Sequence, residues 1–173
     1  MKEAREIFLM LGAVIVILLV LRFNLLGNFL HTNPLASSTP VATGLTNLKP
    51  ITINKTNIMV EIANTEALRE KGLSGINSLP SDQGMIFDFG TKNITPLNAR
   101  FWMKGMLIPL DFIWITNNKV VEITPNVPAP AANTPDNQLL IYQPSENIDF
   151  VLEVNAGFAM NNLIKVGDNV TGL

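Results

Sequence analysis

The segment from Ala99 to Ile115 constrains the fold more than any other part of the chain. It contains both tryptophans, and its second half, from Met106 to Ile115, is apolar except for one acid, Asp111. A strand over 110–115 is therefore apolar on both faces, which predicts an interior position in a sheet that is covered on both sides. Burying an unpaired carboxylate costs several kcal/mol. Asp111 thus needs a partner, which Lys104, Arg100 or a row of backbone amides can supply.

Short strands with alternating apolar residues dominate the chain after residue 50. Tight turns are expected at 54–57 and at Asn117-Asn118. Thr65 is placed to cap a helix over 66–71 that Gly72 ends. Further strands are expected at 51–53, 58–62, 85–89, 119–123, 138–142 and 150–154, and residues 167–170 are expected to form a turn and an edge strand. This pattern predicts a mainly β fold, a single compact β-barrel or sandwich-like domain with one or two short helices.

The first thirty residues are membrane-like rather than globular. Ile7 to Leu21 is an unbroken apolar run, which spans about 22 Å as a helix. Apolar residues after it lengthen the span if Arg22 reaches toward the head groups. Lys2 and Arg5 precede the run, so the positive-inside tendency places the amino terminus in the cytoplasm. We therefore expect residues 1–30 to form a transmembrane helix that acts as a signal anchor.

A tether is expected to join this helix to the domain. Residues 31–49 contain Asn-Pro, Ser-Ser-Thr-Pro and Thr-Gly steps, which are typical of a flexible linker. Residues 50–173 are then the extracytoplasmic β-rich domain. The nearest small-residue cleavage site, Ala36-Ser37-Ser38, lies well beyond the apolar run. An uncleaved anchor is favoured over a cleaved signal peptide, which would leave the domain secreted.

Composition excludes several kinds of site. The chain has no cysteine, and its one histidine, His31, lies in the tether. The domain therefore has no His-based triad, no Cys nucleophile and no metal site built from these ligands, and we expect neither metal nor cofactor. The net charge is −2, with no basic cluster after the amino terminus, which argues against nucleic acid as a partner. The expected partners are the membrane, through the N-terminal helix, and an unknown small molecule or envelope protein.

The chain resembles the family called domain of unknown function 192 in a series of ordered motifs. They are Val60–Thr65, Arg69-x-x-Gly72-Leu-Ser-Gly75, Leu79-Pro80, Gly84–Phe87, Phe101-Trp-Met-Lys104, Ile108-Pro-Leu-Asp111, Val151–Gly157 and Ile164–Asp168. The resemblance implies a barrel-like β-rich fold and a small exported or membrane-tethered prokaryotic protein, but no settled activity. The chain departs from the family pattern at Leu68, in place of an acid, and at Gly105-Met106, in place of Asn-Thr.

Some polar and aromatic residues on the apolar frame are candidates for a ligand site: Arg69, Trp102, Met103, Lys104, Asp111, Glu153 and Asn155. The plainest interpretation of Asp111 is a paired carboxylate that holds the register of its strand. For Glu153 it is a solvent-facing position, on the face opposite Leu152 and Val154. The sharper interpretation is that Glu153 lines a cleft with Asn155. Trp102 and Met103 are more often core or lid than a ligand platform.

Two functions from different classes are compatible with these residues. The first is a non-catalytic binding or accessory module, in which Trp102, Met103 and Tyr142 supply contact area while Lys104 and Arg69 orient an anion. A purely structural tethered domain would instead have no pocket. We favour the binding module and assign no catalytic residue.

The second function is a hydrolase or lyase that uses Asp111 and Glu153 as an acid/base pair. It requires both carboxyl groups to face one cavity, with the pKa of one of them raised. If the two residues lie on opposite sides of the sheet, this hypothesis is wrong.

Overall fold

The computed structural model describes residues 44–90 and 92–173, which all lie within the compact unit Ala42–Leu173. The expected transmembrane helix at 1–30 and most of the expected tether lie outside the described residues. No helix within 44–90 and 92–173 is both long enough and apolar enough to cross a membrane.

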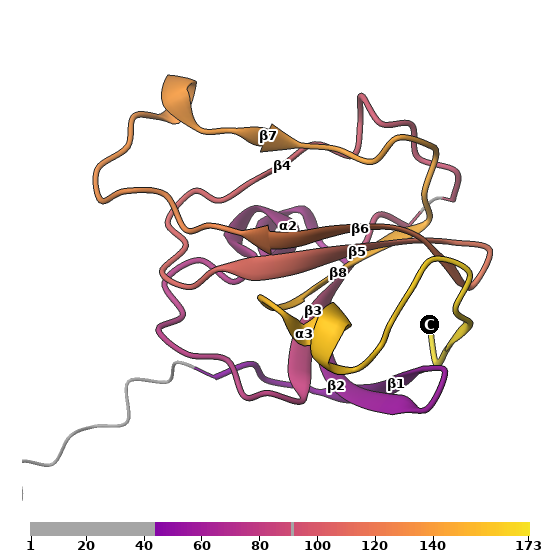
Figure 1. The fold of residues 1–173 in the computed structure, drawn as a ribbon. Coiled ribbons are helices and arrows are strands. Elements are labelled where there is room, and N and C mark those ends of the chain that lie inside the picture. The colour runs from indigo at the N-terminus through magenta and orange to yellow at the C-terminus, as the bar shows by residue number, and fades with distance from the viewer. Residues whose placement is uncertain (1–43, 91) are drawn as a thin grey trace, which may run out of the picture. The chain divides into compact units, whose positions relative to one another are not determined.

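A curled seven-stranded sheet organises the domain (Figure 1). Its strands are β1 (Lys49–Ile53), β2 (Thr56–Ala63), β3 (Gln83–Asp88), β5 (Leu110–Thr116), β6 (Lys119–Val127), β8 (Phe150–Asn155) and β9 (Val170–Thr171). Their order is β6-β5-β8-β3-β2-β1-β9, and only β2 and β3 run parallel. The two edge strands approach each other at one end, where an isolated bridge joins Lys119 to Asn169. The sheet is thus rolled toward a barrel without a full closing ladder.

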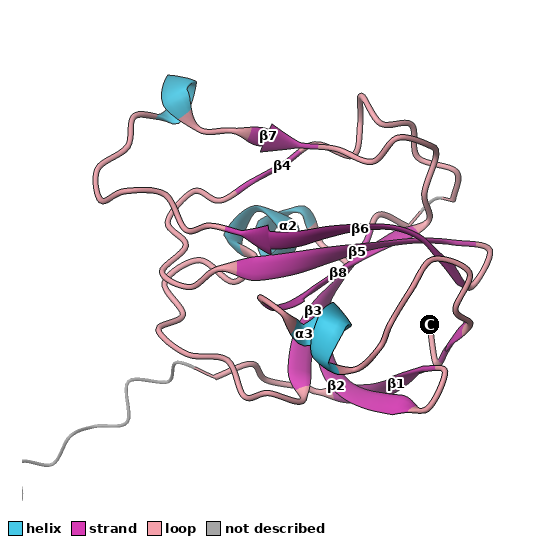
Figure 2. Ribbon diagram, in the orientation of Figure 1, coloured by secondary structure: helices cyan, strands magenta, loops and turns pink. Residues whose placement is uncertain are grey.

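A two-stranded ribbon and short helices complete the domain (Figure 2). In the ribbon, β4 (Phe101–Trp102) pairs with β7 (Ile141–Tyr142). The helical pieces are α2 (Glu66–Lys71), the 3-10 helix η1 (Asp136–Gln138) and α3 (Phe158–Asn161). The connection that contains α2 joins the parallel strands β2 and β3, as parallel pairing requires a crossover. The expectation of a mainly β fold with short helices is confirmed.

Local sequence signals set most of the turns. The Thr65 side chain accepts a hydrogen bond from the Leu68 amide at 3.3 Å and caps α2. Gly72 ends this helix with a φ of 48°, in the left-handed region that glycine tolerates. Asn117 and Asn118 both have positive φ, at 49° and 58°, which gives the two-residue hairpin turn expected between β5 and β6.

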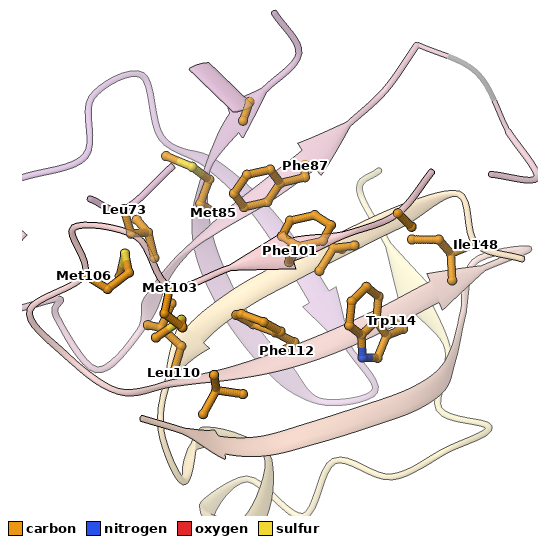
Figure 3. Close-up of a cluster of buried hydrophobic side chains, with 14 of the residues drawn as sticks. Leu73, Met85, Phe87, Phe101, Met103, Met106, Leu110, Phe112, Trp114 and Ile148 are labelled. Atoms are coloured by element: carbon orange, nitrogen blue, oxygen red, sulfur yellow. The ribbon is translucent and has the colours of Figure 1, made fainter. Parts of the chain in front are cut away.

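Two cores lie on opposite faces of the sheet. The ribbon-side core contains Phe112 and Trp114 of β5 and is covered by Phe101 of β4 (Figure 3). The α3-side core contains Ile113 and Ile115 of β5 and is covered in part by α3. Every residue of β5 from Leu110 to Ile115 is buried, so the interior, doubly covered strand expected there is confirmed.

One expected strand is mostly absent. Of the residues 138–142, only Ile141 and Tyr142 pair, while Gln138 belongs to η1. Pro135 precedes that helix, and its carbonyl accepts a hydrogen bond from the Gln138 amide at 2.9 Å. Proline cannot donate to a ladder, and its fixed φ suits the start of a helical turn. The strand that begins at Lys119 is longer than expected and reaches Val127.

Candidate functional site

Asp111 is a structural anchor rather than a member of a pocket. Its side chain has no exposed surface. One carboxylate oxygen accepts hydrogen bonds from the amides of Asn126, at 2.8 Å, and Gly157, at 3.0 Å. The other accepts from the amide of Ala159 at 3.0 Å. Among the partners considered from the sequence, the backbone amides are therefore the correct ones. The carboxylate joins β5 to β6 and to the start of α3.

The structure contradicts the proposed acid/base pair. Across the antiparallel β5–β8 pair, Asp111 lies opposite Val154, whereas Glu153 lies opposite Phe112. Residues that face each other in such a pair point to the same side of the sheet, and neighbours along a strand point to opposite sides. Val154 belongs to the α3-side core and Phe112 to the ribbon-side core. Asp111 and Glu153 therefore lie on opposite faces, and the hydrolase or lyase hypothesis is wrong.

Glu153 is not solvent-facing, because the ribbon covers the face on which it lies. Its exposed fraction is only 5%, and it lines a pocket between α2 and β4. Burial raises the pKa of Glu153 to about 8. At pH 7 this carboxyl is consequently protonated in most molecules. Glu153 thus lines a cleft rather than facing open solvent, but Asn155 does not line this cleft with it.

We call this cavity of about 130 Å³ the Glu153 pocket. It brings four of the sequence candidates together, namely Arg69, Trp102, Lys104 and Glu153. Its remaining lining residues are Glu70, Lys71, Gly72, Leu73, Phe87, Phe89, Arg100, Phe101 and Met106. The pocket is thus lined by four cations, one exposed acid, several apolar side chains and a single buried carboxyl.

Contacts within the domain position two of the cations. The Arg69 guanidinium donates to the Asp88 carbonyl at 2.8 Å and lies 5.5 Å from the centre of the Phe89 ring. The Lys104 ammonium pairs with the Asp136 carboxylate at 2.6 Å and lies 5.5 Å from the Trp102 ring. Cations at such distances over aromatic rings are held by a modest electrostatic attraction. The rim of the pocket is thus partly organised before any ligand arrives.

Three other candidate residues do not line the pocket. Met103 is buried in the ribbon-side core at 3% exposure (Figure 3). Tyr142 pairs with Phe101 and packs edge-on against Phe112, with ring centres 5.6 Å apart. The Asn155 amide donates to the Leu79 carbonyl at 2.8 Å and so holds the connection before β3. Met103 is a core residue, Tyr142 is partly buried and packs against the same core, and Asn155 is a structural residue.

Sequence reasoning missed part of the lining. Arg100 and Lys71 are not among the ligand-site candidates expected from the sequence, yet both line the pocket. Phe87 and Phe101 form one of its walls, with ring centres 5.0 Å apart in an edge-on arrangement. The available signal was the density of cations near two aromatic strands, in the helix that holds Arg69 and in the segment before Phe101.

Comparison with known proteins gives relatives without an established activity. A protein from Novosphingobium aromaticivorans DSM 12444, described as of unknown function, is 30% identical with a TM-score of 0.61, over 76% of this chain and 88% of that one. A protein from Sinorhizobium meliloti 1021, described as a candidate transcription regulator, is 27% identical with a TM-score of 0.59, over 73% of this chain and 96% of that one. No functionally curated protein matches. The model of DUF192, a family described as uncharacterized, matches residues 49–172, and the chain therefore belongs to the DUF192 family.

Proposed function

We propose that the domain is a non-catalytic binding module, held on the extracytoplasmic side of the membrane by its N-terminal helix, and that the Glu153 pocket takes a small anionic molecule. One observation carries the ligand part of the proposal: a pocket with a buried carboxyl is lined by four cations and only one further acid. Concave sites with apolar walls and a few convergent polar groups are the usual form of small-ligand sites.

The charge balance of the pocket favours an anion. Arg69, Lys71, Arg100 and Lys104 line the pocket together with the exposed acid Glu70, and of these cations Lys104 is paired with Asp136. The other three cations outnumber the one exposed acid of the lining. Glu153 carries little charge at pH 7 because its pKa is near 8. The positive electrostatic potential of such a pocket attracts anions and raises their local concentration. Guanidinium groups also recognise carboxylate and phosphate through paired hydrogen bonds.

The membrane part of the proposal is supported by the sequence before residue 44. The apolar run Ile7–Leu21 follows two cations, Lys2 and Arg5, an order typical of a signal anchor with a cytoplasmic amino terminus. Protease treatment of intact spheroplasts tests this topology. If the domain resists digestion until the membrane is broken, the extracytoplasmic placement is wrong.

Nucleic acid is not part of the proposal. The description of the Sinorhizobium relative applies to that protein. This chain has a net charge of −2, whereas binding to a phosphate backbone depends on grouped cations across an extended face.

The ligand proposal is tested with the full chain in a mild detergent. A thermal-shift screen would compare small carboxylates, inorganic phosphate, sulfate, neutral sugars and amino acids, with hits measured by calorimetry. Replacing Arg100 by alanine is expected to weaken a bound anion about tenfold, since a charge-assisted hydrogen bond contributes about 1.4 kcal/mol or more. The matched control is Lys55→Ala, in the exposed turn between β1 and β2. Binding that is insensitive to Arg100, or an absence of any anion hit, would contradict the proposal.

A further inference from the structure

The carboxyl of Glu153 is a buried polar group without a hydrogen-bond partner among the described residues, 44–90 and 92–173. Burial alone accounts for its raised pKa, with no contribution from a hydrogen bond or a neighbouring charge. Among the described residues, every side-chain oxygen that is fully sealed from solvent has a hydrogen-bond partner. The Glu153 oxygens have none, so they are open to the pocket that this residue lines. Unpaired buried polar groups are rare in native proteins and call for an explanation.

The groups that line the pocket around Glu153 come from three sides, and no charge or hydrogen bond of the described residues lowers the pKa of Glu153. On its own sheet face, the neighbours across β3 and β5 are the apolar residues Met85 and Phe112. The helix α2 and its end contribute Arg69, Glu70 and Lys71, and the segment around β4 contributes Arg100 and Lys104. Of these five, Arg69 is half-buried and the other four are exposed. The cations are therefore at the mouth, and the carboxyl is at the floor.

The side chains that line the pocket between its mouth and its floor are apolar. Phe87, Phe101 and Met106 are buried side chains that line the pocket, and Phe87 and Phe101 lie together in the ribbon-side core (Figure 3). A ligand that fills the pocket thus meets cations first, then aromatic and thioether surface, and finally a lone carboxyl. This order specifies the polarity of both ends of the ligand.

We propose that the pocket takes a small organic acid with an anionic group at the mouth and an uncharged oxygen acceptor at its inner end, and that Glu153, carrying its proton, donates a hydrogen bond to that inner oxygen. This inference rests on the proposed function and names the ligand class of the same site. A protonated carboxyl is a hydrogen-bond donor, whereas the ionised form accepts only. Glu153 is then a specificity-determining residue, and the ligand supplies the hydrogen-bond partner that the described part of the chain does not provide.

A ligand with an inner ammonium group is the main rival, and the structure disfavours it. It would require Glu153 to be ionised, although burial opposes that form. The ammonium would also have to pass Arg69, Lys71 and Arg100 at the mouth, where Glu70 is the exposed acid of the lining and Asp136 is paired with Lys104. An oxygen acceptor meets neither obstacle.

Three probes of matched length separate these ligand classes on the full chain: 4-oxopentanoate, which has an inner carbonyl, pentanoate, which has none, and 5-aminopentanoate, which has an ammonium. We expect 4-oxopentanoate to bind at least fivefold more tightly than either of the others at pH 7. The wild-type affinity for it should fall about tenfold between pH 7 and pH 9, because only the protonated fraction binds.

The decisive variant is Glu153→Gln, because glutamine imitates the protonated acid and cannot ionise. Its affinity for 4-oxopentanoate should be equal at pH 7 and pH 9. The matched control Glu146→Gln, at an exposed site, should follow the wild type. Urea unfolding of each variant shows whether it is folded at both pH values.

Preference for 5-aminopentanoate that disappears in Glu153→Gln would overturn this inference and leave an anion-binding pocket in place. Equal binding of pentanoate and 4-oxopentanoate, or wild-type affinity that does not change up to pH 9, would also overturn it. If none of the three probes binds, the ligand class is wrong. The proposed function falls only if the wider anion screen also finds no ligand that depends on Arg100.

Discussion

The buried carboxyl of Glu153 should make the stability of the domain depend on pH in a direction opposite to that of most acids. Its pKa is about 8 in the folded chain, against an ordinary value of 4.5. The folded state therefore holds the proton more tightly than the unfolded state does. The stabilisation that comes from this tighter proton binding is fully present below pH 4.5 and is lost as the pH rises through 8.

The magnitude follows from the two pKa values. Each pKa unit corresponds to about 1.36 kcal/mol. The interval from 4.5 to about 8 therefore corresponds to a loss of about 5 kcal/mol in the free energy of unfolding. Small domains have only about 5–15 kcal/mol in total, so this single carboxyl should make the domain sensitive to alkaline pH.

Glu153→Gln isolates this effect from all other titrations. Urea unfolding of both chains is measured from pH 5 to pH 9, and the difference between their free energies of unfolding is plotted against pH. Between pH 5 and pH 7 the variant should gain about 2.5 kcal/mol relative to the wild type, and above pH 8 the difference should level off. Glu146→Gln, at an exposed position, should give a flat line.

A difference that stays within about 0.5 kcal/mol over this range, the scatter expected of surface substitutions, would refute the reasoning. It would mean that water reaches the Glu153 carboxyl freely and that the pocket floor is not desolvated. A direct carboxyl titration by carbon NMR checks the same claim, since the Glu153 resonance should have its midpoint near pH 8 rather than 4.5.

Four further predictions concern structural residues and the rim. Asp111→Ala leaves three amides without an acceptor, in two buried hydrogen bonds and one partly buried one, and should cost about 3 kcal/mol or more in urea unfolding; a loss below 1 kcal/mol would contradict the anchoring role. Gly84→Ala should destabilise by about 1–3 kcal/mol, because a Cβ there would lie 2.6 Å from the Glu153 carbonyl oxygen; unchanged stability would contradict the close approach of β3 and β8. For Asp149, burial opposes ionisation, but hydrogen bonds from the Asn117 and Asn93 amides hold its pKa below the usual value. The Asp149 carboxylate therefore adds to the free energy of unfolding above pH 3.8, and this stabilisation is lost as the pH falls through the folded pKa. The free energy of unfolding should therefore decrease less steeply toward acid pH in Asp149→Asn than in the wild type. An equally steep decrease would contradict this prediction. Lys104→Ala breaks an exposed ion pair and should leave the melting temperature within a few degrees, which calorimetry checks.

Much of the local structure was predictable because its causes lie within a few residues of sequence. The alternation of apolar residues located most of the strands, and Asn117-Asn118 located a hairpin turn with two positive φ angles. Thr65 and Gly72 bounded α2. The error at 138–142 has the same local origin, because apolar residues suggested a strand while Pro135 started a 3-10 turn.

The surroundings of the two acids were not predictable from sequence. The amide donors to Asp111 come from β6 and from the start of α3, and the latter are 46 and 48 residues away in the chain. An isolated strand shows that the carboxylate needs a partner, but not whether amides or cations will reach it. The β5–β8 register placed Asp111 and Glu153 on opposite faces, and that register is a property of two strands distant in sequence.

The amino-acid sequence by itself determined a β-rich domain, its interior strand and the need to pair Asp111, because each follows from side-chain polarity along a strand. Only the tertiary structure decided that Glu153 is buried and faces a cationic mouth. Its alternation with Leu152 and Val154 assigns it to one face of the sheet, but burial depends on what covers that face. The cover comes from α2 and the β4–β7 ribbon, whose positions are set by packing between segments far apart in the chain.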